Sequence, residues 1–377
     1  MHILQLDSIE PETYGGMEEW IRLVSGGLAA RGHRVTVVGR TGAEFLRRVE
    51  LDTRGVETLH LAIAGDFGPL VIARLRTFMR QRAVDIVTVN FNKDIRLAGI
   101  AARWAGRPRV IWRVGLDIAG DRLRHRLLTP RLVDAVITPS AALKKQIVAH
   151  GYISPEMVTV IPNGIPDRPV HEQRPQAARR LREKYGLPPA ALVAVTSGRF
   201  VDQKGHAYLV AAAGEIIRQA PDIRFLWLGD GPLETRLKAA IADAGLESFF
   251  VFAGMLRDFD LELAGSDFML HPAVEEPFGF VLIEAMRAGL PVAATRVGGI
   301  PEVVAEGSSA VLFPPRDPAA LAAAAVALAC DSDARTRLGR AGRERFEQRF
   351  SADRLVDDVE RFFLSQLEEA GQSHGTA

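Results

Sequence analysis

The stretch "LVAVTSGRFVDQKGHAYLVAAAGEI" (residues 192–216) contains the local pattern that decides the fold. Its first residues are apolar and mostly β-favouring, which predicts a short buried strand, and Gly198 and Gly205 then mark a loop. From residue 206 onward, apolar residues recur at helical spacing. A buried strand followed by a loop and a helix is the repeating unit of a parallel sheet covered by helices.

The same unit recurs in both halves of the chain. In the second half, short apolar strands are predicted at 192–198, 223–230, 249–254, 268–273, 291–295 and 309–315. In the first half they are predicted at 2–7, 34–39, 85–90, 109–114 and 134–140, with helical patterns at 17–31, 70–82, 94–105 and 141–150. Two such series predict an α/β protein with two doubly wound, Rossmann-like domains that face each other across a cleft, where a ligand would bind.

The length and the prolines predict where the domains divide. A chain of 377 residues is too long for one ordinary core. Four prolines and several polar residues interrupt the periodicity of "VIPNGIPDRPVHEQRP" (160–175). We therefore expect an N-terminal domain of residues 1–165 and a second domain of residues 166–350. Residues 351–377 are expected to form a C-terminal amphipathic helix that packs back toward the first domain, and its predicted apolar stripe is Leu355, Val356, Val359, Phe362, Phe363 and Leu367.

Charge is distributed unevenly, although the formal net charge is only +1. Residues 1–165 carry 23 Lys and Arg against 16 Asp and Glu, whereas residues 166–377 carry 24 against 30. Nine arginines lie within 96–131, interleaved with Leu, Ile and Trp. This segment is expected to contact an anionic membrane or a phosphorylated acceptor, and a solvated Arg-rich face is the alternative. Nucleic acid is not an expected partner, because no recognised nucleic-acid-binding module is present.

The sequence also indicates the cellular compartment of the protein. Its single cysteine, Cys330, excludes an internal disulfide and a multi-cysteine metal site. The first residues lack the basic and apolar regions of a signal peptide, and the longest apolar run, at 319–330, is too short to span a bilayer. We expect a cytoplasmic protein that lies peripherally on the inner face of the membrane.

Two carboxylates stand out in "EEPFGFVLIEAMRAG" (275–289). Glu284 lies inside an apolar run that predicts a helix between Gly279 and Gly289, and Glu276 lies just upstream. A carboxylate among apolar residues needs a partner, because its desolvation is costly. The partner is either Arg287, one turn away, or the hydroxyl groups of a ligand such as a ribose diol.

Two cations and two glycines also lie where residues that bind a ligand would be expected. Arg199 and Lys204 flank a loop that opens a helix, where a diphosphate would be favoured by their charge and by the helix dipole. Two solvated loop charges would produce the same pattern. Gly15 and Gly16 follow the first strand and precede a helix, which suits either close approach of a ligand to the backbone or a simple tight turn.

Together these stretches resemble the retaining GT-B glycosyltransferases of family 4. The resemblance covers nearly the whole chain, and its C-terminal half is the more specific part. It is carried by "GHRVTVV" (32–38), "PNG" (162–164), "GR" and "QKG" within 198–205, "GDGP" (229–232), the two glutamates separated by seven residues, and "GGIPEVV" (298–304). The resemblance implies transfer of a sugar from a nucleotide diphosphate donor to an acceptor, with retention at the anomeric carbon.

The resemblance also implies roles for individual residues. Arg199 and Lys204 would bind the donor diphosphate, and Glu276 would bind the hydroxyl groups of the donor sugar, so these three are the predicted catalytic residues. Glu284 would bind the ribose. The other residues that the resemblance places in the donor site are Gly15, Gly16, Gly198, Gly254, Met255, Phe278, Gly279, Phe280 and Leu282.

The acceptor side departs from the family pattern. Many members carry a histidine where this chain has Val114, within "WRVGLD" (112–117), so a role for histidine in activating the acceptor is not carried over. Arg113 and Asp117 are the candidates that remain on this side. The expected acceptor contains a sugar, such as a lipid-linked sugar or a cell-envelope glycan precursor.

No metal ion and no cofactor beyond the nucleotide-sugar substrate are expected. The segment "DSD" (331–333) mimics a metal-binding Asp-x-Asp, but its position after a helix predicts a solvated turn and a helix N-cap. Two alternatives to glycosyl transfer stay open. One is a sugar-nucleotide epimerase or phosphorylase of the same fold, and the other is a non-catalytic protein that binds nucleotide sugars.

Overall fold

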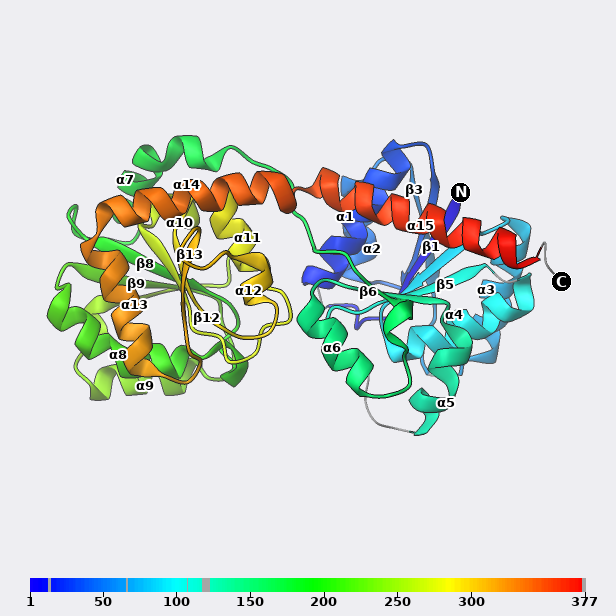
Figure 1. The fold of residues 1–377 in the computed structure, drawn as a ribbon, viewed down its shortest axis with the longest axis horizontal. Coiled ribbons are helices and arrows are strands. Elements are labelled where there is room, and N and C mark those ends of the chain that lie inside the picture. The colour runs from blue at the N-terminus through cyan, green and yellow to red at the C-terminus, as the bar shows by residue number, and fades with distance from the viewer. Residues whose placement is uncertain (13–14, 66, 107, 117–122, 375–377) are drawn as a thin grey trace. The chain divides into compact units, whose positions relative to one another are not determined.

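The computed structural model describes residues 1–12, 15–65, 67–106, 108–116 and 123–374 (Figure 1). The chain forms two compact units. The first unit comprises Met1–Gly164 and Ala352–Ala377, and the second comprises Ile165–Ser351. Each unit is built around its own parallel sheet.

The sheet of the first unit has the strand order β3-β2-β1-β4-β5-β6-β7, with every pair parallel. Its strands are β1 (His2–Asp7), β2 (Arg34–Arg40), β3 (Val56–Leu61), β4 (Ile86–Val89), β5 (Arg109–Arg113), β6 (Ala135–Thr138) and β7 (Val158–Val160). Chain order reverses where β1 pairs with β4. The carboxyl ends of these two strands therefore form the switch point at which such sheets bind ligands.

Helices cover both faces of this first sheet (Figure 1). They are α1 (Gly16–Ala30), α2 (Glu44–Asp52), α3 (Pro69–Gln81), α4 (Asn92–Ala105), α5 (Leu123–Leu132), α6 (Ala141–Ala149) and α15 (Ala352–His374), with a short 3-10 turn, η1 (Pro155–Met157). Strand side chains alternate between the faces: Leu4 and Leu6 pack toward α3 to α6, whereas Ile3 packs toward α1, α2 and α15. The near-continuous apolar strands of the sequence follow from this two-sided burial.

The second unit repeats the architecture. Its sheet has the order β10-β9-β8-β11-β12-β13, again all parallel, so that its switch point lies between β8 and β11. Its strands are β8 (Leu192–Ser197), β9 (Ile223–Leu228), β10 (Phe250–Gly254), β11 (Phe268–His271), β12 (Val292–Thr295) and β13 (Ala310–Phe313).

The helices of the second unit divide between two apolar clusters, one on each face of its sheet. One cluster includes residues of α7 (Arg174–Lys184), α10 (Asp260–Gly265), α11 (Phe280–Arg287), α12 (Ile300–Val303) and α14 (Ser332–Arg349). The other includes residues of α8 (His206–Gln219), α9 (Glu234–Asp243) and α13 (Pro318–Cys330). The 3-10 turns are η2 (Val170–Gln173), η3 (Asp202–Lys204) and η4 (Glu247–Phe249).

The structure confirms the predicted fold class and all eleven predicted strands to within three residues at either end. The sequence patterns missed β3, an edge strand whose side chains are mostly polar or partly exposed, and β7, which has three residues. In α15 the predicted apolar stripe is confirmed, since Leu355, Val359 and Phe363 are fully buried in the cluster that α15 forms with α1. The prediction for "DSD" is also confirmed, because Asp331 caps α14 by accepting a hydrogen bond from the Ala334 N–H.

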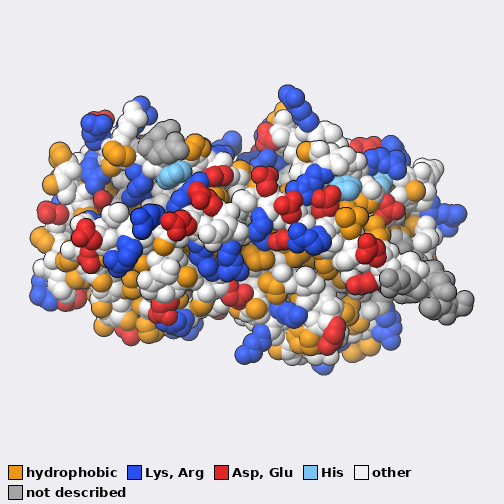
Figure 2. All heavy atoms as spheres, turned by 45° about the horizontal axis from the view of Figure 1, so that its top comes forward, with side chains coloured by type: hydrophobic (Ala, Val, Ile, Leu, Met, Phe, Trp, Pro, Cys, Tyr) orange, Lys and Arg blue, Asp and Glu red, His pale blue; other side chains and the backbone are white. Residues whose placement is uncertain are grey.

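Figure 2 turns the α14 side of the second unit toward the viewer, and Lys and Arg side chains are interspersed there with carboxylates and apolar groups. Among the helices that the structure describes, none combines the length and the apolar character needed to cross a membrane.

Candidate functional site

The first element of the site is the loop that follows β8. The strand ends at Ser197, Gly198 and Arg199 follow, and the 3-10 turn η3 ends at Lys204, just before α8. Lys204 is therefore presented at the N-terminus of a helix and at the carboxyl end of a central strand, beside the switch point of the sheet.

The second element is the loop that follows β11, the neighbouring strand. This loop carries Glu276, which is only 8% exposed. Lys204 Nζ donates to Glu276 Oε2 at 2.6 Å, and His271 Nε2, at the end of β11, lies 3.2 Å from the same oxygen. Both contacts are made to Oε2, so within the described chain Oε1 remains free to accept a hydrogen bond from a ligand hydroxyl.

Two glycines allow the backbone segments around Lys204 and Glu276 to pack closely against one another. Gly205 has a φ of +70°, and a Cβ at this position would collide with the carbonyl oxygen of Pro272. Gly298, with a φ of +51°, lies equally close to the carbonyl oxygen of Glu276. No residue with a side chain fits either position without moving the backbone. The glycines of the "QKG" and "GGIPEVV" motifs thus fix the backbone around Lys204 and Glu276.

Electrostatics keep this carboxylate ionised. Burial alone would raise the pKa of Glu276, but the hydrogen bond from His271 and the charge of Lys204 outweigh it and bring the pKa to about 2. Burial lowers the pKa of His271, although Glu276 opposes that shift, so the imidazole is neutral at neutral pH. Because an ionised carboxylate only accepts hydrogen bonds, the proton of this ring lies on Nε2.

His206, the first residue of α8, is a candidate that the sequence patterns missed. Its ring packs edge-on against Phe200 and Trp227, at centroid distances of 4.8 and 5.0 Å. Burial lowers the pKa of His206 to about 3, and the positive charge of Lys204 acts in the same direction. Neither ring nitrogen has a hydrogen-bond partner in the described structure, an arrangement that is rare in protein cores. We therefore add His206 to the candidate residues around Lys204.

The remaining predicted donor residues fall into two groups. Phe278 and Leu282 are buried in the apolar core of the second unit, where they position the start of α11. Gly279 precedes α11 with a φ of +101°, and Phe280 begins the helix, so their backbone lies at the helix N-terminus. Arg199, in contrast, is exposed, and its side chain makes no ion pair with any residue that the structure describes.

Glu284 is half-buried on α11 rather than enclosed by the core. Arg287, the partner offered by the alternative interpretation, pairs with Asp260 and donates to the carbonyl oxygen of Pro166 at 3.2 Å. At the end of β10, Gly254 has a φ of +71° and Met255 is 58% exposed, which leaves this apolar side chain available to a ligand.

In the first unit, the predicted glycines begin α1. Gly15 is its N-cap, and its N–H donates to Glu18 Oε2 at 2.6 Å, while Gly16 is the first helical residue. Glu18 is itself buried and its second carboxylate oxygen has no partner in the described structure. The sequence patterns did not single out Glu18, because a Glu at this position is a common helix-capping residue.

The structure places Arg113 in a buried polar cluster at the switch point of the first sheet. The cluster also contains Asp7, which ends β1, and Asp94, at the start of α4. Arg113 Nη2 donates to Asn163 Oδ1 at 3.0 Å, and burial lowers the pKa of this guanidinium to about 10. Asp117, the other predicted acceptor-side residue, lies outside the described residues.

The cluster contains more carboxylates than positively charged groups. Burial, followed by the charge of Asp94, raises the pKa of Asp7, and burial also raises the pKa of Glu18. For Asp94, burial outweighs the hydrogen bonds from Ser8 and Phe91 and raises the pKa to about 6. Ionising these groups therefore destabilises the folded state.

We predict that Asp94→Asn stabilises the protein at pH 7.5, on the order of 2 kcal/mol, because the ionised carboxylate is replaced by a neutral acceptor. The folded wild type binds the Asp94 proton more tightly than the unfolded state, so the stability that Asp94 contributes is present below about pH 4 and is lost as pH rises through about 6. The advantage of Asp94→Asn over the wild type should therefore be small at about pH 4 and large at about pH 7.5. Melting temperatures at pH 4 and 7.5 check this. Asp52→Asn, at an exposed carboxylate, is the control, and an equal loss of stability at both pH values in Asp94→Asn would contradict it.

Comparison with known proteins assigns the class. A model described as Glycosyltransferase Family 4 matches residues 14–168, and a model described as Glycosyl transferases group 1 matches residues 191–331. Together with the two Rossmann-like sheets, these matches define a GT-B glycosyltransferase.

Relatives agree with this class. The 2-deoxystreptamine glucosyltransferase of Streptomyces kanamyceticus is 32% identical over 64% of this chain and 67% of the relative. The 2-deoxystreptamine N-acetyl-D-glucosaminyltransferase of Streptomyces fradiae is 28% identical over 98% and 95%. The crystal structure of HepE from Anabaena in complex with UDP shares the fold, with a TM-score of 0.83, 23% identity and coverage of 97% and 100%. The chain belongs to the group 1 glycosyltransferases, and it is an enzyme, as the motifs predicted.

Proposed function

We propose that this enzyme is a retaining, metal-independent glycosyltransferase that takes its sugar from a nucleoside diphosphate donor. The observation that carries the proposal is the buried, ionised Glu276 held by Lys204 and His271 at the carboxyl ends of β8 and β11. Structures of HepE that share the fold are described as complexes with UDP and with UDP-glucose, which supports a nucleotide-sugar donor.

The proposed chemistry needs stabilisation of two charges. The bond between the anomeric carbon and the diphosphate oxygen breaks, and negative charge develops on the diphosphate, where Lys204, Arg199 and the helix N-termini supply positive charge. Positive charge develops on the sugar, which the ionised Glu276 stabilises through its hydroxyl groups. The acceptor oxygen attacks on the face that the diphosphate leaves, and its proton passes to the departing phosphate oxygen.

We propose that the acceptor binds in the first unit, near Arg113, and that it contains either a sugar or a cyclitol. A lipid-linked sugar or a cell-envelope glycan precursor is the first candidate acceptor. The relatives named for 2-deoxystreptamine make an aminocyclitol the second. Three buried carboxylates against one guanidinium, at the switch point of the first sheet, favour an acceptor that carries amino groups.

The test begins with a thermal-shift panel of UDP-, GDP- and ADP-sugars, since a ligand at 100 times its Kd stabilises by about 2.7 kcal/mol. The donor that shifts the melting temperature is then mixed with lipid-linked sugars and with aminocyclitols. Release of nucleoside diphosphate only when an acceptor is present supports glycosyl transfer. Donor turnover without any acceptor, or binding without turnover, would support the epimerase, phosphorylase or non-catalytic alternatives.

We predict that activity survives excess EDTA, because the chain supplies Lys204 and Arg199 where metal-dependent transferases hold a divalent cation between carboxylates. The rate of nucleoside diphosphate release, measured with and without EDTA, is expected to agree within about twofold. Loss of activity on chelation and recovery with Mg²⁺ or Mn²⁺ would contradict the prediction.

We also propose that the enzyme is cytoplasmic and that the Arg-rich segment 96–131 contacts anionic lipid on the inner face of the membrane. Arg124 and Arg126 are exposed on α5, next to the exposed apolar side chains of Leu123 and Leu127. Arginine beside exposed leucine suits the boundary between lipid headgroups and acyl chains. Arg122, which belongs to the same segment, lies outside the described residues.

We predict that reversing the charges of Arg122, Arg124 and Arg126 to Glu weakens binding to anionic vesicles, because each cation near such a surface contributes about 1 kcal/mol. Vesicle flotation at low salt measures the effect, and added salt should weaken binding of the wild type. A triple reversal at Arg179, Arg236 and Arg337, exposed residues of the second unit, is the control. Equal flotation of the α5 variant and the wild type would leave a solvated Arg-rich face as the explanation.

A further inference from the structure

A second concave site lies in the second unit, away from the residues assigned to the donor. It is a pocket of about 480 Å³ at the amino ends of β11 and β12, where Asp267 and Pro291 precede the two strands. The donor residues lie at the carboxyl ends of β8 and β11. The two sites therefore occupy opposite edges of one sheet, and the pocket volume falls within the range of small-molecule sites.

One wall of the pocket is a single face of α14. Arg335, Gly339 and Arg343 line it at spacings of four residues, and Arg340 lies three residues before Arg343, so these residues lie on the same side of the helix. Gly339 matters for the packing beneath, since a Cβ there would collide with the carbonyl oxygen of Gly289.

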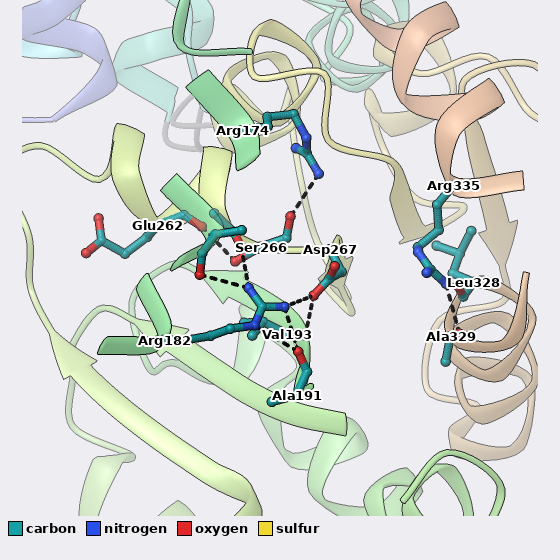
Figure 3. Close-up of polar contacts among 12 residues, drawn as sticks. Arg174, Arg182, Ala191, Val193, Glu262, Ser266, Asp267, Leu328, Ala329 and Arg335 are labelled. Atoms are coloured by element: carbon teal, nitrogen blue, oxygen red, sulfur yellow. Dashed lines mark hydrogen bonds and ion pairs between the residues drawn. The ribbon is translucent and has the colours of Figure 1, made fainter. Parts of the chain in front are cut away.

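The opposite wall is formed by His171 of η2 and Arg174 of α7. Four arginines thus face the pocket against Asp267, the one acidic residue among the described residues that line it. The charge of Asp267 is already balanced by other groups of the protein. Its carboxylate accepts hydrogen bonds from Arg182 Nη2 at 2.9 Å and from the Val193 N–H at 2.7 Å (Figure 3).

Among the residues that the structure describes, Arg174 and Arg335 have only backbone acceptors as partners (Figure 3). Arg335 Nη1 donates to the carbonyl oxygens of Leu328 and Ala329 at 2.6 and 2.8 Å, at the end of α13. Arg174 Nη2 donates to the carbonyl oxygen of Ser266 at 2.9 Å, and burial lowers the pKa of this guanidinium. Neither forms an ion pair with a carboxylate of the described chain.

Arg343 is the exception in the set, because Asp167 accepts from its Nη1 and Nη2 at 2.7 Å each. Arg340 is 79% exposed at the mouth and lies 3.9 Å from Glu344. The positive charge that faces the pocket without a matching carboxylate therefore comes from Arg174 and Arg335. Both retain guanidinium N–H groups that donate to no acceptor in the described structure, and His171 Nδ1 is also buried there without a partner.

We propose that this pocket binds the phosphate group of a small phosphorylated molecule, at a site distinct from the donor site. Phosphate oxygens accept hydrogen bonds from the planar guanidinium group. A phosphate would therefore be the anionic partner of Arg174 and Arg335, which have no carboxylate partner in the described chain. The volume exceeds what inorganic phosphate alone would fill, so the ligand is a phosphate ester of about the size of a sugar phosphate.

The experiment titrates glucose 6-phosphate into the full chain by calorimetry at low ionic strength, where charge interactions are least screened. Saturable binding is expected in the wild type. Arg340→Glu reverses an exposed charge at the mouth and should weaken binding about tenfold. Thr336→Glu adds a carboxylate to the same helix face and should weaken binding at least as much. Arg337→Glu makes the same charge change on another face of α14 and should bind within about twofold of the wild type.

Lys204→Ala separates this pocket from the donor site, since binding here should survive that change. Inorganic phosphate should compete with glucose 6-phosphate, and vesicles that contain phosphatidylglycerol should not. The proposal is overturned if no saturable binding occurs up to about 10 mM. It is also overturned if Lys204→Ala abolishes binding while Arg340→Glu does not, or if only the vesicles bind. None of these outcomes depends on the identity of the transferred sugar.

Discussion

Lys204→Ala is expected to weaken donor binding by about 10- to 150-fold, because a charge-assisted hydrogen bond contributes roughly 1.5–3 kcal/mol. The structure adds a second consequence that the sequence alone does not predict. Lys204 is the cationic partner of Glu276, which is 8% exposed, so the variant leaves a buried carboxylate with only His271. We expect a loss of stability of about 2 kcal/mol, below the roughly 3–5 kcal/mol of fully buried pairs, because Lys204 is partly exposed.

Two further variants separate these effects. Lys204→Arg keeps the charge and should recover most of the stability. Combining Lys204→Ala with Glu276→Gln removes both charges, so the melting temperature should rise again while donor binding stays weak. Calorimetric titration of the donor and thermal melts provide the readouts. Unchanged donor affinity in stable Lys204→Ala protein would remove this residue from the donor site.

Glu276→Gln is expected to lower kcat on the order of 10²-fold, with a smaller change in donor KM. In the proposed mechanism the carboxylate faces the group on which charge develops, and removing one such electrostatic contact typically has this effect on the chemical step. Glu284→Gln, on the helix α11 that follows the Glu276 loop, provides the matched comparison. If Glu284 binds the ribose, which does not react, its variant should mainly raise donor KM and leave kcat nearly unchanged.

The alternative for this pair is a purely structural role for both carboxylates. Both variants would then melt at lower temperature and keep near-normal kinetics in the folded fraction. Measurement of kcat, donor KM and melting temperature for the two variants distinguishes these outcomes. A stable Glu276→Gln enzyme with unaltered kcat would overturn the assignment of Glu276.

The positions of the strands and the residues of the core follow from local patterns in the sequence. Short runs such as 192–196 and 223–228 are buried on both faces of a parallel sheet, so nearly every residue in them is apolar. Glycines at 198, 205 and 279 mark turns at which the backbone has a positive φ. The edge strand β3 lacks this signal, because it is partly exposed and carries polar side chains.

The contacts of the site depend on packing between distant segments, which no local pattern encodes. Lys204 and Glu276 lie 72 residues apart, and their pairing follows from the adjacency of β8 and β11. The sequence patterns did not identify His271 as a site residue, because one histidine at the end of a buried strand resembles a core residue. Arg113 was a predicted acceptor-side residue, but its grouping with Asp7 and Asp94 was not predicted, because the three come from separate segments.

The most direct test of the central claim is the anomeric configuration of the product. An α-linked nucleotide sugar, identified by the donor panel, is followed with its acceptor by proton NMR. We expect the anomeric signal of the donor to disappear only when acceptor is present, and the new glycoside to carry the α configuration. A β-linked product would contradict retention, and consumption of the donor at the same rate without acceptor would contradict glycosyl transfer itself.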